Sequence, residues 1–179
     1  MPKKKTFFDK RIVVCGVMCA LSILILYLGA MIEVLDLSMS AIASLVIVLI
    51  VIEMGYSYAW LTYIAVSILS VVLLPQKLAA IFFAAFMGFY PIVKSYIEKI
   101  RSAILCWTLK LSLANVALVV SYLVIRFFVP EELETDIMMW TLYIMALAAF
   151  ILYDIAISKL ITAYFYKFRE RLKIYKLLK

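Results

Sequence analysis

The sequence predicts an all-α integral membrane protein, a six-transmembrane-helix bundle with both termini cytoplasmic. Of its 179 residues, 68% are hydrophobic and 16% are charged, which lies far outside the usual composition of a soluble globular domain. Apolar runs recur along the whole chain, and most approach the roughly 20 residues that an α-helix needs to cross a bilayer core. Basic residues are confined almost entirely to alternate connections between these runs, which is typical of membrane proteins with a fixed orientation.

Six apolar runs define the expected spans of one membrane domain that covers residues 1–179. The second and fourth runs are short, so their flanks or an adjustment of the bilayer must complete the crossing. Connections between the runs are short, apart from the segment VPEELETD after the fifth run. The predicted spans are 12–32, 37–52, 54–74, 78–93, 103–125 and 137–158.

The positive charges give the orientation of the bundle. With the amino terminus inside, every Lys and Arg except Lys77 and Arg126 falls at a cytoplasmic end. The net charge of +7 therefore indicates contact with anionic lipid, and no nucleic acid partner is expected. The basic tail 164–179 has an amphipathic pattern. It is expected either to lie in the cytoplasmic interface or to extend the sixth span as a solvated helix.

The first span contains the stretch CGVMCALS, in which Gly16 and Ala20 are four residues apart. Small residues at this spacing let another helix approach closely, and the packing gain matters because lipid offers no hydrophobic drive for helix association. The partner helix is either internal or belongs to another subunit. Gly16 and Ala20 are therefore candidate docking residues.

Polar and aromatic residues on the third, fifth and sixth spans are candidates for binding a small solute. Aromatic faces sandwich a flat molecule, and Asn or Ser supplies directional hydrogen bonds. Interfacial aromatic belts and hydrogen bonds between helices explain the same residues without a ligand. The candidates are Tyr63, Ser67, Asn115, Tyr122, Trp140 and Tyr143.

The fourth span carries a proline and a glycine inside the stretch FFAAFMGFYPIVKSYIEKI, residues 82–100. Pro91 has no amide hydrogen and crowds the carbonyl of Met87, and Gly88 lowers the cost of bending. We expect a kink near Gly88 to Pro91. It is a candidate hinge between an apolar outer half and a charged inner half.

Four ionisable residues, Glu53, Lys94, Lys110 and Asp154, lie in or near the spans and are expected to form buried ion pairs. Pairing lowers the cost of charge in a membrane and fixes how the helices rotate and register. Snorkelling to the inner headgroups is one alternative, with Glu98 one turn from Lys94 as a local partner. A role as a relay or as the counter-charge of a solute is another.

Signals for chemistry are missing. Histidine is absent, and the chain has no glycine loop for phosphate and no metal-ligand pattern. No two acids sit in mid-membrane, where the roles of general acid and base could be assigned. The sequence therefore predicts a protein that is not an enzyme, with no metal site and no cofactor.

The span number, the chain length, the early small-residue motif and the lack of an energy domain together resemble the substrate-binding S components of energy-coupling-factor transporters. The resemblance implies a subunit of the bacterial cell membrane that binds a vitamin or similar solute in its outward half. A transmembrane coupling subunit would dock at Gly16 and Ala20, and separate ATPases would supply the energy. Glycine stands here where that family usually has alanine.

The chain is also similar in size and span number to rod-shape proteins of the MreD type and to several families of bacterial multi-span proteins. That resemblance implies a scaffold that holds other membrane proteins through its basic inner ends and small-residue faces. A scaffold needs no outward pocket, whereas a transport subunit does.

Overall fold

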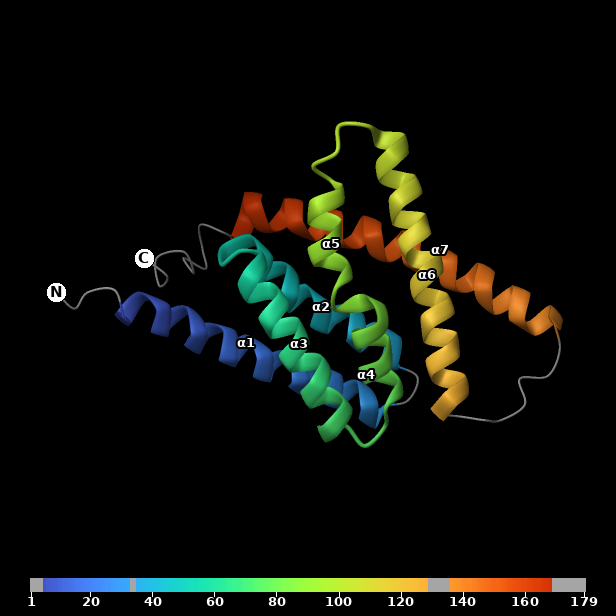
Figure 1. Ribbon diagram of the computed structural model, residues 1–179, viewed down its shortest axis with the longest axis horizontal. Helices are drawn as coiled ribbons and strands as arrows, with labels where there is room; N and C mark the ends of the chain where they lie inside the picture. The colour runs from blue at the N-terminus through green and yellow to red at the C-terminus, as the bar shows by residue number, and fades with distance from the viewer. Residues whose placement is uncertain (1–4, 33–34, 129–135, 169–179) are drawn as a thin grey trace.

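The computed structural model describes residues 5–32, 35–128 and 136–168, with the side chains of 10–32, 35–121, 123, 141 and 143–166. Every element in these ranges is helical, as Figure 1 shows. The elements are α1 (Lys5–Met31), α2 (Asp36–Glu53), α3 (Tyr56–Leu73), α4 (Leu78–Phe82), the π-helical turn η2 (Phe83–Met87), α5 (Tyr90–Ile97), α6 (Ala103–Phe128), α7 (Asp136–Ala163) and the π-helical turn η3 (Tyr164–Phe168).

Six helical stretches within the described residues are long and apolar enough to cross a membrane. Four are single helices, the fourth, Leu78–Ile97, is assembled from α4, η2 and α5, and the sixth, Tyr143–Tyr166, runs from α7 into η3. This fourth stretch continues past the predicted end at residue 93, so Lys94 lies inside it. The basic tail 164–179 begins as η3 at the end of α7, and its remainder from residue 169 lies outside the described residues.

Successive stretches run in alternating directions, so their ends gather at two opposite sides of the molecule (Figure 1). The start of α1 and the end of α7 lie on the left of the view. The turn between α2 and α3 is only two residues long, and Gly55 has a φ of 95° there, a conformation that residues with a side chain rarely adopt. Gly55 thus permits a direct reversal of the chain.

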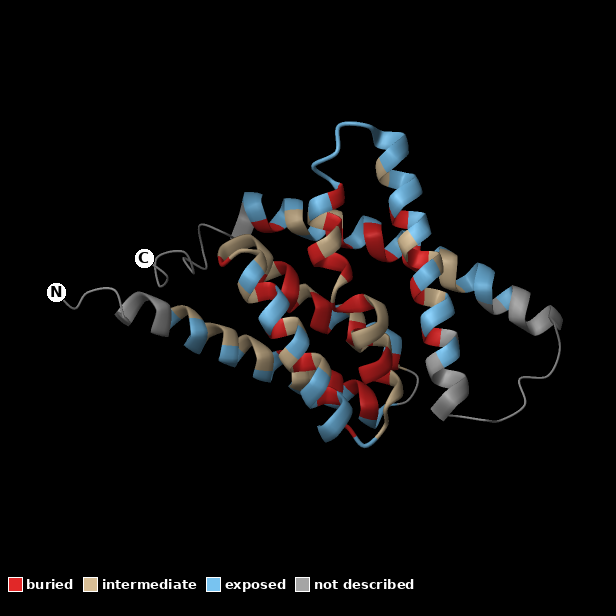
Figure 2. Ribbon diagram, in the orientation of Figure 1, coloured by how far each residue is buried: buried red, intermediate tan, exposed pale blue. Residues whose placement is uncertain are grey.

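The second and fourth stretches form the centre of the bundle. In these two stretches 44% and 56% of the residues are buried, against 17–22% in the other four. The buried segments in Figure 2 follow this division. One apolar core joins α1, α2, α3 and α4, and another joins α2 and the fourth stretch to α6 and α7. Much of α5 and η2 is therefore enclosed by protein, including Phe83, Tyr90 and Lys94, whereas Tyr96 on α5 is exposed.

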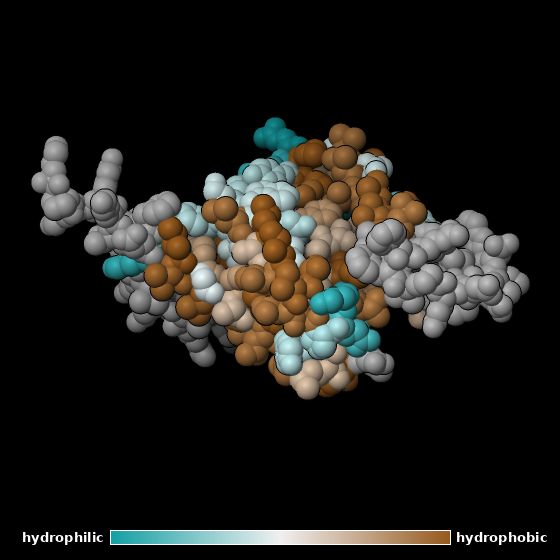
Figure 3. Space-filling model, turned by 60° about the horizontal axis from the view of Figure 1, so that its bottom comes forward, coloured by the Kyte–Doolittle hydropathy of each residue, from teal (hydrophilic) through white to brown (hydrophobic). Residues whose placement is uncertain are grey.

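Large aliphatic side chains cover the outside of the bundle. Ile104, Val72 and Leu152, from three different helices, are 76%, 71% and 68% exposed, and apolar residues dominate the described part of the face in Figure 3. Soluble monomers rarely expose continuous apolar surface of this kind. The outside of the bundle therefore suits contact with lipid chains.

Candidate functional site

The fourth stretch is interrupted at residues 83–91, a segment we call the break. Inside it the amide of Gly88 bonds to the carbonyl of Phe83, five residues back, at 2.8 Å. The regular partner four residues back would be Ala84. The hydroxyl of Tyr63 on α3 instead donates to the Ala84 carbonyl at 2.7 Å, so a side chain from a neighbouring helix satisfies the backbone where the helical pattern changes.

Pro91 affects a second carbonyl of the break. Because proline has no amide hydrogen, the carbonyl of Met87 has no partner four residues ahead. The hydroxyl of Tyr153 on α7 lies 3.2 Å from this carbonyl and 2.6 Å from Oγ of Ser44 on α2. Backbone groups that are buried away from water must find partners within the protein, and α3 and α7 supply them here.

The geometry around Gly88 depends on the absence of a side chain. A Cβ built on Gly88 would lie 2.7 Å from Cδ2 of Tyr63 and 2.8 Å from Cε1 of Phe83. Glycine therefore lets the ring of Tyr63 come close enough to reach the Ala84 carbonyl. The irregularity of the fourth stretch, expected at Gly88 to Pro91, begins earlier in the chain with the π-helical turn η2.

On the carboxyl-terminal side of the break lies a group of charged residues that we call the charge cluster: Lys94, Glu98, Lys110 and Asp154. Asp154 on α7 lies at its centre: Oδ1 accepts from Lys94 and, at 2.5 Å, from the hydroxyl of Tyr90, and Oδ2 accepts from Lys110 at 3.1 Å. Glu98 Oε1 lies 3.3 Å from Nζ of Lys94 and 2.9 Å from Nζ of Lys110. Helices α5, α6 and α7 are joined by these contacts.

Lys94 makes further contacts with α7. Its ammonium group donates to the backbone carbonyl of Asp154 at 2.9 Å and to Oγ of Ser158 at 2.7 Å. The Ser158 hydroxyl in turn lies 3.0 Å from the same carbonyl. All three protons of the ammonium group can therefore be donated to α7.

The charges of the cluster balance. Two lysines face two carboxylates, and the side chains of Lys94, Asp154 and Lys110 are only 1%, 4% and 8% exposed, whereas Glu98 is 42% exposed. Burying an unpaired charge costs several kcal/mol, and pairing with hydrogen bonds offsets that cost. The cluster therefore has no net charge. Three of its side chains are buried, and the fourth, Glu98, is exposed to solvent.

The four residues expected to form buried ion pairs are only partly brought together. Lys94, Lys110 and Asp154 meet, and Glu98 completes the group. Glu53, at the end of α2, lies elsewhere and accepts a hydrogen bond from Tyr164 at 3.0 Å. The sequence of a span indicates how deep a charge lies in the membrane but not which neighbouring helix it faces. For this reason Glu53 could not be separated from the other three residues by sequence.

The residues expected to bind a solute are divided between two places. Tyr63 lies against the break, while Asn115 on α6 accepts a hydrogen bond from Tyr143 on α7 and donates to the Leu111 carbonyl at 2.8 Å. Ser67 follows Tyr63 by one turn on α3. Tyr122 and Trp140 belong to α6 and α7, but their side chains lie outside the described residues.

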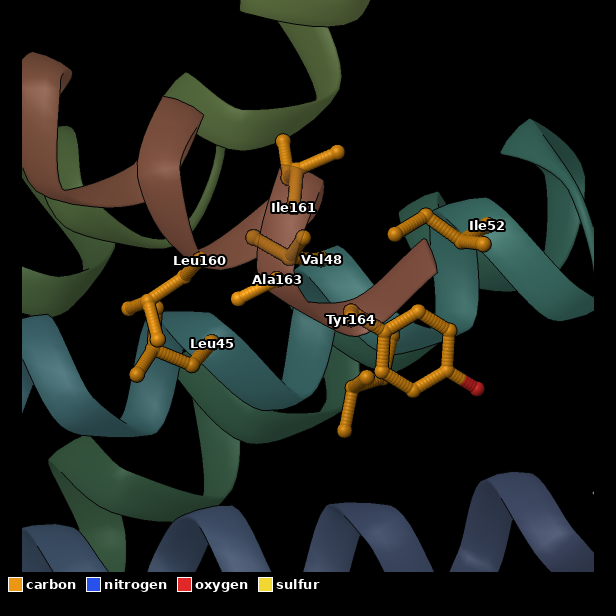
Figure 4. Close-up of a pocket in the computed structure, with 8 residues that line it drawn as sticks. Leu45, Val48, Ile52, Leu160, Ile161, Ala163 and Tyr164 are labelled. Carbon is orange, nitrogen blue, oxygen red and sulfur yellow. The ribbon is translucent and has the colours of Figure 1, made fainter. Parts of the chain in front are cut away.

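A small apolar cavity of about 190 Å³ lies between α2 and the end of α7 (Figure 4). It is at the opposite end of α7 from Tyr143. Its walls are aliphatic except for the ring of Tyr164. The lining residues are Leu45, Val48, Leu49, Ile52, Leu160, Ile161, Ala163 and Tyr164.

The candidate docking residues Gly16 and Ala20 face outward on α1. Both are exposed, and a Cβ placed on Gly16 would meet no atom within 4 Å. α1 packs against α2 and α3 through other residues, including Leu26 and Ala30. The small-residue surface is thus not used for packing within the described part of the chain.

Several residues of the site were missed in the sequence: Tyr90, Tyr153, Ser44 and Ser158. A signal for two of them was available. Tyr90, Lys94 and Glu98 follow one another at intervals of four, as do Asp154 and Ser158, and residues four apart share a helix face. Ser44 and Tyr153 carry no such signal, because what they contact depends on how α2, α7 and the break pack together.

No protein-family profile, curated protein or solved structure matches the chain. The fold and the site therefore define the class of protein by themselves. In its described part it is a helical protein with six candidate membrane-crossing stretches, of which the fourth is broken and adjoins a buried, neutral charge cluster.

Proposed function

We propose that the chain is a non-enzymatic subunit of the bacterial cell membrane that takes part in the uptake of a small solute, with both termini in the cytoplasm. The supporting observation is the broken fourth stretch next to the charge cluster. Helices interrupted within the membrane, and ionisable residues buried among spans, are associated with transport pathways. A separate ATPase module would drive the movement.

The break supplies a mechanism for reorientation. On its amino-terminal side, Ser40 on α2 donates to the Ala79 carbonyl of α4 at 2.9 Å, and at its start Tyr63 links the turn η2 to α3. On its carboxyl-terminal side, Lys94 links α5 to α7. These polar contacts go to different helices, although α2, α3 and α6 pack against both halves of the fourth stretch. A movement of α7 relative to α3 would be absorbed at Gly88 to Pro91.

The solute would bind in the outward half, between α6 and α7. Asn115 and Tyr143 offer polar groups there, and they already contact each other. Ligand binding would replace their mutual hydrogen bond with bonds to the solute. Hydrogen-bond groups at a mostly apolar site fix the orientation of a small molecule.

Mass spectrometry of the protein purified in mild detergent tests this proposal by identifying any small molecule that co-purifies. A panel of vitamins and nucleobases is then screened for a rise in the thermal unfolding temperature. Asn115→Leu is expected to abolish the retention and the rise, and Ser112→Ala, an exposed polar position on the same helix, to preserve both. If nothing co-purifies and no compound stabilises the protein, uptake is ruled out in favour of the second candidate.

The second candidate is a membrane scaffold that binds other membrane proteins. It is favoured by the open small-residue surface at Gly16 and Ala20. Gly16→Leu should release a partner that co-purifies from native membranes, because a large side chain prevents close helix approach. In a scaffold this release would be the main defect, whereas in a transport subunit the solute would still bind.

A further inference from the structure

The buried part of the charge cluster is not neutral without Glu98. Lys94, Lys110 and Asp154 are almost completely enclosed and together carry one positive charge. Glu98 supplies the balancing negative charge from the open side, with 42% of its side chain exposed. Neutrality at this site therefore depends on whichever anion occupies the position of the Glu98 carboxylate.

The Glu98 carboxylate is held by few contacts. Both ammonium groups reach the same oxygen, Oε1, at 3.3 and 2.9 Å, and Oε2 has no hydrogen-bond donor among the described residues. Glu98 follows the last residue of α5 and precedes an exposed turn. A rotation of this side chain into solvent would leave the anion position open and both lysines in place.

The open side of the cluster has the composition of a headgroup-binding surface. Nζ of Lys110 lies 5.7 Å from the centre of the Trp107 ring, which is 43% exposed. Lys99 and Arg101 follow Glu98 and are exposed. Tryptophan and basic residues at the end of a span favour the level of lipid headgroups, where pockets with basic residues between helices bind anionic lipids.

We propose that the position of the Glu98 carboxylate is an exchangeable anion site, which takes a phosphate group without an attached cation and releases Glu98 to solvent. The phosphate belongs to an anionic phospholipid of the inner leaflet or is a free phosphate ion. The proposal rests on the membrane location in the proposed function and does not depend on solute uptake. A lipid bound here would connect the packing of α5, α6 and α7 to the composition of the membrane.

Glu98→Gln removes the intramolecular anion and provides the test. Its thermal unfolding temperature is measured in nanodiscs of phosphatidylcholine, in nanodiscs that also contain phosphatidylglycerol, and in phosphatidylcholine with added inorganic phosphate. In phosphatidylcholine alone the variant should unfold roughly 5–15 °C below the wild type, because a net positive charge stays buried. Phosphatidylglycerol, free phosphate or both should restore most of the lost stability. If only one of them does so, that one is the source of the anion.

Two control variants separate site binding from general effects of negative lipid. Glu53→Gln removes a carboxylate from the end of another helix, outside the cluster, and should not gain more from phosphatidylglycerol than the wild type. Glu98→Gln/Lys110→Gln should lose the gain, because the remaining buried pair is neutral. The proposal is overturned if neither anion restores Glu98→Gln, or if Glu53→Gln or the double variant gains equally.

A shorter carboxylate keeps the test available if Glu98→Gln does not fold. Glu98→Asp retains the charge but draws it away from the two ammonium groups. It is expected to be less stable than the wild type in phosphatidylcholine and to gain more than the wild type from the effective anion. Equal gains in the two proteins would contradict the proposal.

Discussion

The ring of Tyr63 occupies the space that a side chain at Gly88 would need. A Cβ at Gly88 would lie 2.7 Å from Cδ2 of that ring, and the Tyr63 hydroxyl is bonded to the Ala84 carbonyl at 2.7 Å. The ring cannot retreat without losing this bond. The position of one glycine is thus coupled to the hydrogen bonding of Ala84, four residues before it in the break.

Gly88→Ala is expected to destabilise the protein by about 1–3 kcal/mol, the usual range for an added carbon in a tightly packed place. The measurement is the free energy of unfolding of the purified protein in detergent. Gly16→Ala is the matched control, since its added Cβ meets nothing within 4 Å, and it should leave stability nearly unchanged. Equal effects of the two substitutions would show that the close approach at Gly88 does not limit stability.

Asp154→Asn should be strongly destabilising, by about 3–5 kcal/mol, because it leaves one of two buried lysines without a balancing charge. Asp154→Asn/Lys110→Gln restores neutrality, so its loss should be smaller than the sum of the two single losses by at least about 1 kcal/mol. Unfolding of all four proteins in detergent provides this comparison. Lys159→Gln, an exposed lysine on the same helix, serves as the control and should change stability little. Additive losses at positions 154 and 110 would argue against the pairing.

Pro91→Ala should weaken the dependence of the protein on the Tyr153 hydroxyl. The new amide offers the Met87 carbonyl a partner within its own helix, so this carbonyl no longer relies on α7. In the wild type, Tyr153→Phe is expected to cost about 1–3 kcal/mol for the buried groups it leaves unsatisfied. The same change should cost less in the Pro91→Ala background, and part of its cost should persist through Ser44. If the cost is the same in both backgrounds, the Met87 contact has no energetic role.

Cysteine labelling tests the proposed orientation. In a variant with the three native cysteines replaced by serine, Ser57→Cys lies in the first turn of α3 and Ser102→Cys just before α6, both on one side, and Pro75→Cys lies in the connection between α3 and α4 on the other. A membrane-impermeant maleimide added to intact cells should label position 75 alone. Positions 57 and 102 should react only after the membrane is opened. Labelling of position 57 or 102 in intact cells would reverse the orientation.

Much of the helical architecture could be predicted from the sequence because each stretch is long and apolar by itself. The presence of an irregularity in the fourth stretch could also be predicted, since Pro91 removes a specific hydrogen bond. The π-helical turn before it could not, because it depends on Tyr63 offering the Ala84 carbonyl a substitute partner from another helix. The same limit applies to the expected solute residues, where Tyr63 and Asn115 share a polar character but contact different parts of the bundle.

The charge cluster shows most clearly which contacts follow from local sequence and which depend on the packing of helices. The intervals of four that link Tyr90, Lys94 and Glu98 define one face of α5 from the sequence alone. That this face meets Asp154 and not Glu53 depends on the packing of α5 against α6 and α7, which no local pattern records. Asp154 also lies next to Tyr153, so two neighbouring residues of α7 serve the cluster and the break together.

The central position of Asp154 has a consequence for biosynthesis. The fourth and fifth stretches, with Lys94 and Lys110, are synthesised before α7 brings the carboxylate that both lysines contact. We therefore expect a chain that stops after residue 128 to remain an unfinished intermediate, open to membrane proteases, even though five of its six stretches are present. Pulse-chase measurement of its half-life against the complete chain tests this, and equal half-lives would contradict it. The arrival of α7 would then act as the signal that the six stretches can assemble.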